Sequence, residues 1–263
     1  MRIAGSTVLL TGATGGIGRV IARQLTEKGA RLVLTGRRAD ALEPVAAEFN
    51  ARGVVADLAD AAQVARLAET CADSEILIAN AALPSSGDLL DYTPEQLDRA
   101  LAVNLRAAIA LSRLLAPRMV EMGRGHIVLI GSISGKAATR SSSLYNATKF
   151  GLRGFAHGFR QDLHGTGVGV SLVQPGFVRD AGMFAATGAT PPGGVRTVSP
   201  EQVAAGVIRA IERDVCEVNV APLELRLLSA IAGQFPGFAE KIQRRAGAER
   251  AIARIVDAQR QTR

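Results

Sequence analysis

The most informative stretch of this 263-residue sequence is Thr11-Gly12-Ala13-Thr14-Gly15-Gly16-Ile17-Gly18. It joins an apolar run, Thr7–Leu10, to a pattern typical of a helix that continues to Lys28. Gly12 permits a tight turn, Gly16 lets the backbone approach a pyrophosphate, and Gly18 lets helix and strand pack closely. The free N–H groups of the new helix would then face an anion. The alternative is an ordinary strand-to-helix turn.

The whole chain is large and apolar enough to form one domain. Hydrophobic residues make up 48% of it, and no linker or charge run divides it, so we expect a single domain over residues 1–263. Its two cysteines, Cys71 and Cys216, show no metal-ligand spacing and no His partner nearby, which argues against disulfides and metal sites. An early strand and the lack of a long apolar run predict no signal peptide and no transmembrane segment. A reduced, cytoplasmic setting fits.

Positive charge is concentrated at the end of the chain. The net charge is +7, and seven basic residues stand against two acidic ones between residues 241 and 263. No aromatic residue lies between these charges to stack on bases, so a solvated basic helix is favoured over a nucleic-acid or membrane patch. The basic residues are Lys241, Arg244, Arg245, Arg250, Arg254, Arg260 and Arg263.

Apolar runs alternate with helical patterns along the chain. This alternation predicts an α/β fold, a Rossmann-type doubly wound parallel sheet of about seven strands with a core over about 5–220. After the first strand, strands are expected at 31–35, 54–56, 76–79, 126–130, 167–173 and 217–220. Helices are expected at 39–49, 60–70, 93–122, 144–164 and 199–213, with Asp60, Thr93 and Ser199 as N-caps. A mobile lid (about 181–198) and a helical C-terminal segment (about 222–263), broken at Pro236-Gly237, complete the expected organisation.

The end of the second expected strand indicates which dinucleotide would bind. Gly36 is followed by Arg37 and Arg38, with no carboxylate until Asp40. An arginine here accommodates a ribose 2′-phosphate, whereas an acidic residue would bond the 2′-hydroxyl. NADP is therefore favoured over NAD, and a solvated basic turn is the alternative. Ligands of such sheets bind at the carboxyl ends of the strands, where several polar or turn-forming residues fall: Gly12, Arg37, Asp57, Asn80, Ser132 and Pro175.

A tyrosine and a lysine stand one helical turn apart. Tyr145 and Lys149 share a face of their helix, so the ammonium should lower the pKa of the phenol toward working pH, as a general acid/base requires. Ser132, at a strand end thirteen residues upstream, could hold a substrate oxygen beside the phenol, with Ser134 as the alternative. Asn104, inside the long helix, could hold a water or backbone group that links Lys149 to solvent.

As a set, these residues make the chain similar to the short-chain dehydrogenases/reductases of the compact, single-domain kind, across about residues 5–220. The matching motifs are Thr11 to Gly18, Asp57, Asn80-Ala81-Ala82, Asn104, Ser132, Tyr145, Lys149 and Pro175-Gly176. The resemblance implies that Tyr145 is the acid/base and that Lys149 lowers its pKa and holds the nicotinamide ribose. It also implies that Ser132 orients the substrate and that Asn104 completes a proton relay.

The resemblance also implies a set of cofactor contacts. Asp57 would meet the adenine, and Asn80 would support the cofactor backbone. The full expected cofactor-binding set is Gly12, Thr14, Gly15, Gly16, Ile17, Gly18, Arg37, Arg38, Asp57, Leu58, Asn80, Ala81, Tyr145, Lys149, Pro175, Gly176 and Val178.

Three features depart from the family pattern. The glycine spacing also satisfies the longer epimerase/dehydratase branch, but that branch has a larger C-terminal domain, and the chain length argues against it. Asn80 is flanked by Ala79 and Ala81-Ala82, where Asn-Asn-Ala-Gly is common, so altered packing near the ribose is expected. Asp180 stands where the family often has a threonine that bonds the nicotinamide carboxamide, which affects the first contact of the lid.

The function expected from these observations is an NADP-linked oxidoreductase that interconverts a carbonyl and an alcohol, with reduction favoured. Two other classes are a non-catalytic nucleotide sensor or scaffold and a peripheral membrane or nucleic-acid protein that uses the basic tail. The substrate is expected to be small and apolar, and the resemblance implies a homodimer or homotetramer. An apolar pocket or a dimer surface would use Met183, Phe184, Leu227, Leu228, Phe235 and Phe238. The three histidines, His126, His157 and His164, are expected to be structural.

Overall fold

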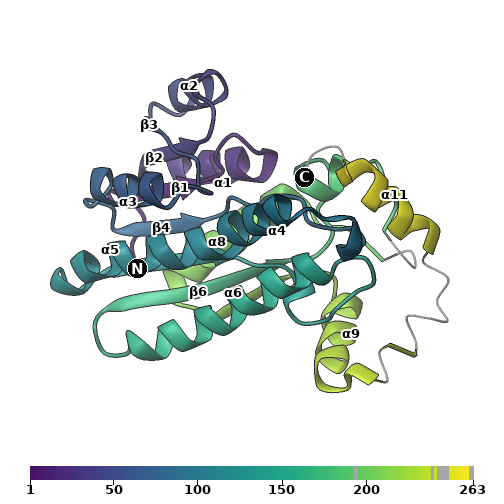
Figure 1. Ribbon diagram of the computed structural model, residues 1–263. Helices are drawn as coiled ribbons and strands as arrows, with labels where there is room; N and C mark the ends of the chain where they lie inside the picture. Colours follow the sequence, from purple (N-terminus) through teal and green to yellow (C-terminus); the bar gives the residue numbers. More distant parts are fainter. Residues whose placement is uncertain (192–194, 238–239, 242–248, 261–263) are drawn as a thin grey trace.

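The computed structural model describes residues 1–191, 195–237, 240–241 and 249–260. Its strands form one parallel sheet in the order β3-β2-β1-β4-β5-β6-β7. The strands are β1 Thr7–Thr11, β2 Arg31–Gly36, β3 Arg52–Val55, β4 Ile76–Ala79, β5 Gly125–Ile130, β6 Val168–Pro175 and β7 Glu217–Val220. The order reverses between β1 and β4, which confirms the predicted doubly wound sheet (Figure 1).

Helices connect the strands and cover both faces of the sheet (Figure 1). They are α1 Gly16–Glu27, α2 Ala39–Glu48, α3 Ala61–Thr70, α4 Pro94–Leu101, α5 Ala107–Glu121, α6 Ser143–Asp162, α7 Gly182–Ala185, α8 Pro200–Arg213, α9 Leu223–Gln234 and α11 Glu249–Arg260, with single 3₁₀ turns at η1 Leu89–Asp91 and η3 Ile133–Gly135. The three predicted N-caps are confirmed. Asp60 accepts hydrogen bonds from the second and third residues of α3, while Thr93 and Ser199 each form a capping box.

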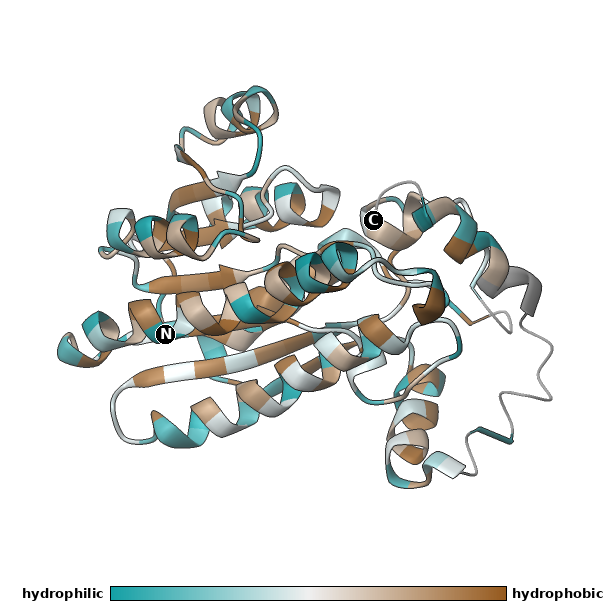
Figure 2. Cartoon of the chain, in the orientation of Figure 1, coloured by the Kyte–Doolittle hydropathy of each residue, from teal (hydrophilic) through white to brown (hydrophobic). Residues whose placement is uncertain are grey.

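Alternate side chains of each central strand pack into two separate hydrophobic cores, one on each face of the sheet. In β1, Val8 and Leu10 pack with α1, α2 and α8, whereas Leu9 packs with α3, α5 and α6 on the opposite face. The same alternation holds in β4 and β5, because successive residues of a strand point to opposite faces. Figure 2 shows these strands as apolar between helices whose outer sides are hydrophilic. Strands that are buried on both faces explain the continuous apolar runs in the sequence.

The long helix predicted over residues 93–122 contains one irregular turn. A π-helical segment, η2 (Ala102–Arg106), separates α4 from α5, and the N–H of Ala107 bonds the carbonyl of Ala102. The stretch Pro94–Glu121 is the one described helix that is long and apolar enough to cross a membrane by length and composition, but half of its most apolar window is buried. Its buried side chains pack against the sheet, so the core accounts for that composition.

The C-terminal segment contains the two predicted helical parts. α9 ends at Gln234 and the helix is interrupted at Phe235, whereas Pro236 and Gly237, where the break was predicted, are themselves helical. Arg260 of α11 forms an ion pair with Asp91, with 2.9 Å between Nη2 and Oδ2. Several predicted positions lie outside the described residues: 192–194 of the expected lid, Phe238, Arg244, Arg245 and Arg263.

Both cysteines are free, as the sequence predicted, but the expectation that neither has a histidine partner is wrong. The fold brings His157 Nδ1 of α6 to 3.3 Å from Cys216 Sγ, which precedes β7. Because 59 residues separate the two, spacing along the sequence gave no signal of the contact. Among the described residues, no group of three His, Cys, Asp or Glu side chains is placed to hold a metal ion.

Candidate active site

The glycine turn after β1 has the geometry of an anion cradle. Gly12 has a φ of +66°, and a Cβ there would lie 2.8 Å from the Cα of Ala81. A Cβ on Gly18 would lie 2.2 Å from the carbonyl oxygen of Gly12, so only glycine fits where α1 meets the turn. A Cβ on Gly16 would lie 2.7 Å from the Cβ of Ala181. Glycine is therefore required at three positions of the turn. The contacts fit the predicted tight turn at Gly12 and the close helix–strand packing at Gly18, whereas the approach of Gly16 to a pyrophosphate stays a prediction.

Within the described residues, no side chain caps the N-terminus of α1. Gly15 occupies the N-cap position without a side-chain hydrogen bond, and the first turn contains no acidic residue. By contrast, α3, α4 and α8 are capped by side chains. The first N–H groups of a helix lack intrahelical partners and carry the positive end of its dipole. The start of α1 therefore fits the pyrophosphate of a dinucleotide.

A set of hydrogen bonds joins the ends of β1 and β4 at the point where the strand order reverses. The N–H groups of Asn80 and Ala81 both donate to Thr11 Oγ1, each over 3.0 Å. Asn80 Nδ2 donates to the carbonyl oxygens of Thr11 (3.0 Å) and Gly12 (3.2 Å). Asn80 thus fixes the glycine turn itself. The role of Thr11 was not predicted, although a polar residue that ends an apolar strand could have signalled it.

The end of β2 presents the two predicted arginines to solvent. Arg37 and Arg38 are exposed, and Arg38 Nε lies 3.3 Å from Asp40 Oδ1. Arg37 makes no ion pair or hydrogen bond with the part of the chain that the structure describes. Gly36 lies against the glycine turn, because a Cβ there would be 3.1 Å from Thr14 Cγ2. An open guanidinium therefore stands beside the cradle.

Asp57 and Leu58 follow β3 at the same edge. Asp57 accepts a hydrogen bond from the N–H of Ala59 and pairs with Arg99 of α4 at 3.1 Å. Partial burial tends to raise the pKa of Asp57, but the bonds from Ala59 and Arg99 outweigh it and hold the pKa below its ordinary value. Leu58 is buried. The part that Arg99 plays was not predicted, since 42 residues separate it from Asp57.

Three predicted catalytic side chains meet at the carboxyl ends of β5 and the start of α6. The hydroxyls of Tyr145 and Ser132 share a hydrogen bond. Lys149 Nζ lies 5.7 Å from the centroid of the Tyr145 ring and donates to the carbonyl oxygen of Ile130 over 2.9 Å. Ser134, the predicted alternative to Ser132, contributes only its N–H, which donates to Ser132 Oγ. Ser132 is therefore the serine beside the phenol.

The predicted net lowering of the Tyr145 pKa is not found in this state of the protein. Burial raises the pKa of Tyr145 above its ordinary value, and the hydrogen bond with Ser132 acts in the opposite direction without cancelling it. Burial also lowers the pKa of Lys149 to about 8, because the ammonium loses water and gains only the Ile130 carbonyl. The sequence placed the two groups correctly, but it contained no measure of their burial.

Asn104 lies in the π-helical turn and holds a loop. Its Oδ1 accepts from the N–H of Leu83 over 2.6 Å, and its Nδ2 donates to the Leu83 carbonyl and to Ser85 Oγ. The water or backbone group through which Asn104 was expected to link Lys149 to solvent stays a prediction. Asn104 fixes the loop after β4 against the helix that carries it.

The strand β6 continues through Pro175, and the segment after it covers the glycine turn. The N–H of Gly176 bonds the carbonyl of Val220, and Val178 pairs with Val198 at the base of the expected lid. Asp180 has a φ of +65°, a left-handed conformation that is uncommon for a residue other than glycine. A Cβ on Gly182 would lie 2.9 Å from Ile17 Cδ1. This segment therefore rests on the start of α1.

The apolar residues predicted for the substrate side fall into two groups. The ring of Phe184 in α7 packs at a tilt against that of Phe177, with ring centroids 4.8 Å apart. Phe184 also lines a hollow of about 610 Å³ between residues 179–191 and Thr197. Leu227 and Leu228 on α9, and Phe235 directly after it, are 55–60% exposed. Residues on the inner side of the same helix approach Gly176 and Lys136. The exposed side chains on α9 therefore form an outer surface, whereas Phe184 of α7 packs on Phe177.

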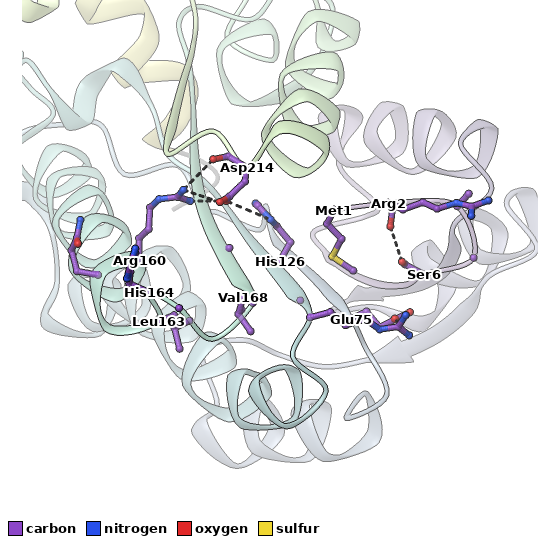
Figure 3. Close-up of a pocket in the computed structure, with 18 residues that line it drawn as sticks. Met1, Arg2, Ser6, Glu75, His126, Arg160, Leu163, His164, Val168 and Asp214 are labelled. Atoms are coloured by element: carbon purple, nitrogen blue, oxygen red, sulfur yellow. Dashed lines mark hydrogen bonds and ion pairs between the residues drawn. The ribbon is translucent and has the colours of Figure 1, made fainter.

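A larger cavity lies at the opposite, amino edge of the sheet. Figure 3 shows this space of about 810 Å³ beside Glu75, His126, Arg160 and Asp214. Arg160 pairs with both carboxylate oxygens of Asp214, and His126 Nε2 lies 2.8 Å from Ser171 Oγ. The predicted structural role of His126 is thereby supported, and none of the predicted site residues lines this cavity.

Comparisons with known proteins agree with this geometry. Residues 6–191 match the short chain dehydrogenase family. The chain is 36% identical over 227 residues to the ketoacyl reductase HetN of Nostoc sp. (strain PCC 7120 / SAG 25.82 / UTEX 2576), covering 83% of this chain and 79% of that protein. It is 32% identical over 226 residues to an uncharacterized oxidoreductase of Staphylococcus aureus (strain N315), covering 82% and 96% of the two chains.

Solved structures give the same result. A short-chain dehydrogenase from Sphingobium yanoikuyae, in complex with NADPH, superposes with a TM-score of 0.77 at 29% identity, covering 89% of this chain and 95% of that one. Most of the chain is thus similar to short-chain dehydrogenases. This similarity accompanies the sheet order, the glycine turn and the cluster of Ser132, Tyr145 and Lys149. The protein belongs to the short chain dehydrogenase family of oxidoreductases.

Proposed function

We propose that this protein is an NADP(H)-dependent oxidoreductase that interconverts a carbonyl and an alcohol. The observation that carries the proposal is the hydrogen-bonded Tyr145 and Ser132 pair, with Lys149 beside the Tyr145 ring, at the same sheet edge as the uncapped start of α1. A hydroxyl pair of this kind can hold one substrate oxygen and exchange a proton with it. A nucleotide sensor or scaffold would not need all three side chains together.

The proposed cofactor would be held by groups along the carboxyl edge. The first N–H groups of α1 and the glycine turn would bind its pyrophosphate, and Lys149 would contact the ribose near the reacting ring. NADPH would supply the hydride when bound. Gly12, Gly16 and Gly18 leave no room for a Cβ, so a side chain at any of these positions would disturb the turn that is proposed to bind the phosphates.

Tyr145 would act as the proton donor in carbonyl reduction. Its raised pKa keeps the phenol protonated at neutral pH, which suits a general acid. Ser132 would hold the carbonyl oxygen of the substrate within reach of that proton. Once the proton has left, the Lys149 ammonium would stabilise the phenolate, since opposite charges attract strongly in a site with little water. Reduction is therefore the direction that the resting protein favours.

The preference for NADP rests on Arg37 and Arg38. Arg37 stands open beside the cradle, and a guanidinium makes charge-assisted, bidentate hydrogen bonds to a phosphate. After Gly36, the first carboxylate in the sequence is Asp40, so no acidic residue stands directly at the end of β2 to bond a 2′-hydroxyl. The solved Sphingobium yanoikuyae relative with NADPH is consistent with this assignment.

The substrate is expected to be an apolar carbonyl compound. Phe177 and Phe184 supply aromatic surface where the segment after β6 meets the site. The relatives include a ketoacyl reductase, so acyl-chain ketones belong in the test beside simple aldehydes, ketones and quinones.

The test measures binding and turnover separately. Binding of NADPH and NADH would be followed by fluorescence, and consumption of each would be followed with the panel of carbonyl compounds. We expect NADPH to bind more tightly and to be consumed with at least one apolar carbonyl. NADPH binding without consumption across the panel would favour the sensor, and a preference for NADH would contradict the role of Arg37.

A further inference from the structure

A second cluster of reactive groups lies away from the proposed active site, between α6 and β7. Cys216 Sγ lies 3.3 Å from His157 Nδ1, and His157 Nε2 lies 3.2 Å from Glu217 Oε2. The three side chains form a continuous thiol–imidazole–carboxylate chain. This is the order of groups that activates cysteine nucleophiles, with the carboxylate orienting the base.

The carboxylate fixes which nitrogen of His157 carries the proton. An ionised Glu217 can only accept hydrogen bonds, so Nε2 of the neutral ring must be the donor. Nδ1 is then left with a lone pair that faces the thiol and can take its proton. Burial tends to raise the pKa of Glu217, but Lys136 and Arg153 outweigh it and lower that pKa to about 2. The orienting charge is therefore present at neutral pH.

Cations outnumber carboxylates around the Cys216 thiol. Lys136 and Arg153 form ion pairs with Glu217, and Arg160 is close enough to Cys216 to interact electrostatically. The described carboxylates facing the cluster are Glu217 and, at the end of α8, Asp214, which pairs with Arg160. Three fixed cations therefore stand against two carboxylates, and nearby cations increase the reactivity of a cysteine.

The cluster is open to small reagents. The His157 side chain is 37% exposed, and Cys216 is half-buried. The other cysteine provides an internal contrast, because Cys71 is fully buried and burial raises its pKa to about 11. One thiol is thus partnered and reachable, and the other is inert in the folded protein.

We infer that Cys216 is a site of thiol–disulfide exchange with small-molecule disulfides, and that His157 is its base. The thiol proton passes from Cys216 Sγ to His157 Nδ1, and the thiolate attacks one sulfur of the disulfide. A new S–S bond to Cys216 forms while the original S–S bond breaks. The leaving thiolate takes the proton from the imidazolium, so the protein thiol is oxidised and the small disulfide yields one free thiol. The product is a mixed disulfide on Cys216.

The test uses the neutral 2-hydroxyethyl disulfide and the full-length chain, without cofactor or carbonyl substrate. Peptide mass spectrometry would follow modification of each cysteine at neutral pH, in the folded protein and in the urea-unfolded chain. We expect Cys216 to react about tenfold faster in the folded protein than in the unfolded chain, while Cys71 reacts only after unfolding. A Cys216 rate that is equal or slower in the folded protein would overturn the inference.

A variant assigns the role of the histidine. His157→Gln should slow modification of folded Cys216 by about tenfold, whereas His164→Gln, at the end of the same helix, should leave it unchanged. An unaltered rate in His157→Gln with a native melting temperature would contradict the assignment. Should His157→Gln fail to fold, the folded-to-unfolded rate ratio of the natural chain still decides. Because no step involves Tyr145 or NADPH, the result is independent of the proposed oxidoreductase activity.

Discussion

The two edges of the sheet differ in how their polar groups are satisfied. At the amino edge, three of the ionisable groups that line the large cavity have protein partners: Glu75 with Arg124 and the N–H of Thr7, Arg160 with Asp214, and His126 with Ser171. At the carboxyl edge, the start of α1 has no side-chain cap, and Arg37 has no ion pair within the described residues. The carboxyl edge therefore offers a ligand an uncapped helix start and an exposed guanidinium.

This difference shows that cavity volume is a poor guide to function in this fold. A cavity whose charges pair with each other offers little to a ligand, since binding would have to break those pairs. Groups held open by glycines and a helix terminus require no such loss. Four measurements test whether the carboxyl edge is built for binding and chemistry and the amino edge for stability.

The largest expected effect is loss of the proton donor. Tyr145→Phe should lower kcat by about 10²–10⁴-fold while NADPH binding stays unchanged, because only the transferable proton is removed. Steady-state kinetics and a fluorescence titration measure the two quantities. The matched control is Tyr92→Phe, which alters the only other tyrosine and should keep full activity. A Tyr145→Phe rate within about threefold of the natural one would refute the proposed mechanism.

The second prediction concerns pH and the amino edge. Burial lowers the pKa of His126 from 6.5 to about 4, with the nearby amino terminus and Arg160 acting in the same direction against Asp214. Between pH 6.5 and pH 4 the unfolded chain binds a proton that the folded protein does not, so stability falls as the pH falls through this window. The fully developed loss is about 3 kcal/mol, and above pH 6.5 the group has no effect.

Urea unfolding between about pH 4 and 8 measures this slope. His126→Gln should remove the part of the slope due to this group and leave carbonyl reduction at neutral pH intact, whereas His164→Gln should keep the slope. An identical pH dependence in His126→Gln would show that the buried imidazole is not responsible. If His126→Gln folded normally but lost activity, the amino edge would contribute to the chemistry, which would contradict the proposed separation of roles between the two edges.

The third prediction tests the cradle. A Cβ in Gly18→Ala would lie 2.2 Å from the Gly12 carbonyl oxygen, so the turn must shift. We expect about 1–3 kcal/mol of destabilisation and a loss of NADPH affinity of about tenfold or more. Gly154→Ala is the matched control, because a Cβ at that helical position meets nothing within 4 Å. Melting temperature and NADPH titration compare the pair, and equal affinities in both variants would argue against the cradle.

The smallest effect concerns cofactor choice. Arg37→Ala should raise the KM for NADPH by about tenfold and leave that for NADH unchanged, since a solvent-exposed charge-assisted bond is worth about 1.5 kcal/mol. Arg66→Ala, an exposed arginine on α3, controls for the loss of one positive charge. If both variants behave alike, Arg37 contributes only general electrostatic attraction and the specific phosphate contact is wrong.

The sequence predicted the fold and the grouping of the site because both follow from local patterns. Apolar runs, N-cap residues such as Asp60 and Ser199, and the glycine turn each act within a few residues. Parallel strands then bring their carboxyl ends together, which places Gly12, Asn80 and Ser132 at one edge without any knowledge of side-chain contacts.

The parts that were missed depend on contacts between distant segments or on burial. Arg99 reaches Asp57 across 42 residues, and His157 reaches Cys216 across 59. The direction of the Tyr145 pKa depends on how much water the phenol loses, which no spacing reveals. Asn104 was placed in the correct helix, but its loop contacts at Leu83 and Ser85 follow from the π-helical turn.

That turn also sets a rule for changing the length of the chain. It holds one residue more than a regular helix needs, so removing one residue from Ala102–Arg106 would restore ordinary i to i+4 bonding throughout. The shortened helix would nevertheless rotate Pro94–Leu101 by about 100° about its axis relative to α5. Arg99 would swing away from Asp57, and the segment after β4 would lose its anchor. The extra residue therefore sets the rotation of α4 relative to α5, so that Arg99 can reach Asp57 while Asn104 holds the segment after β4.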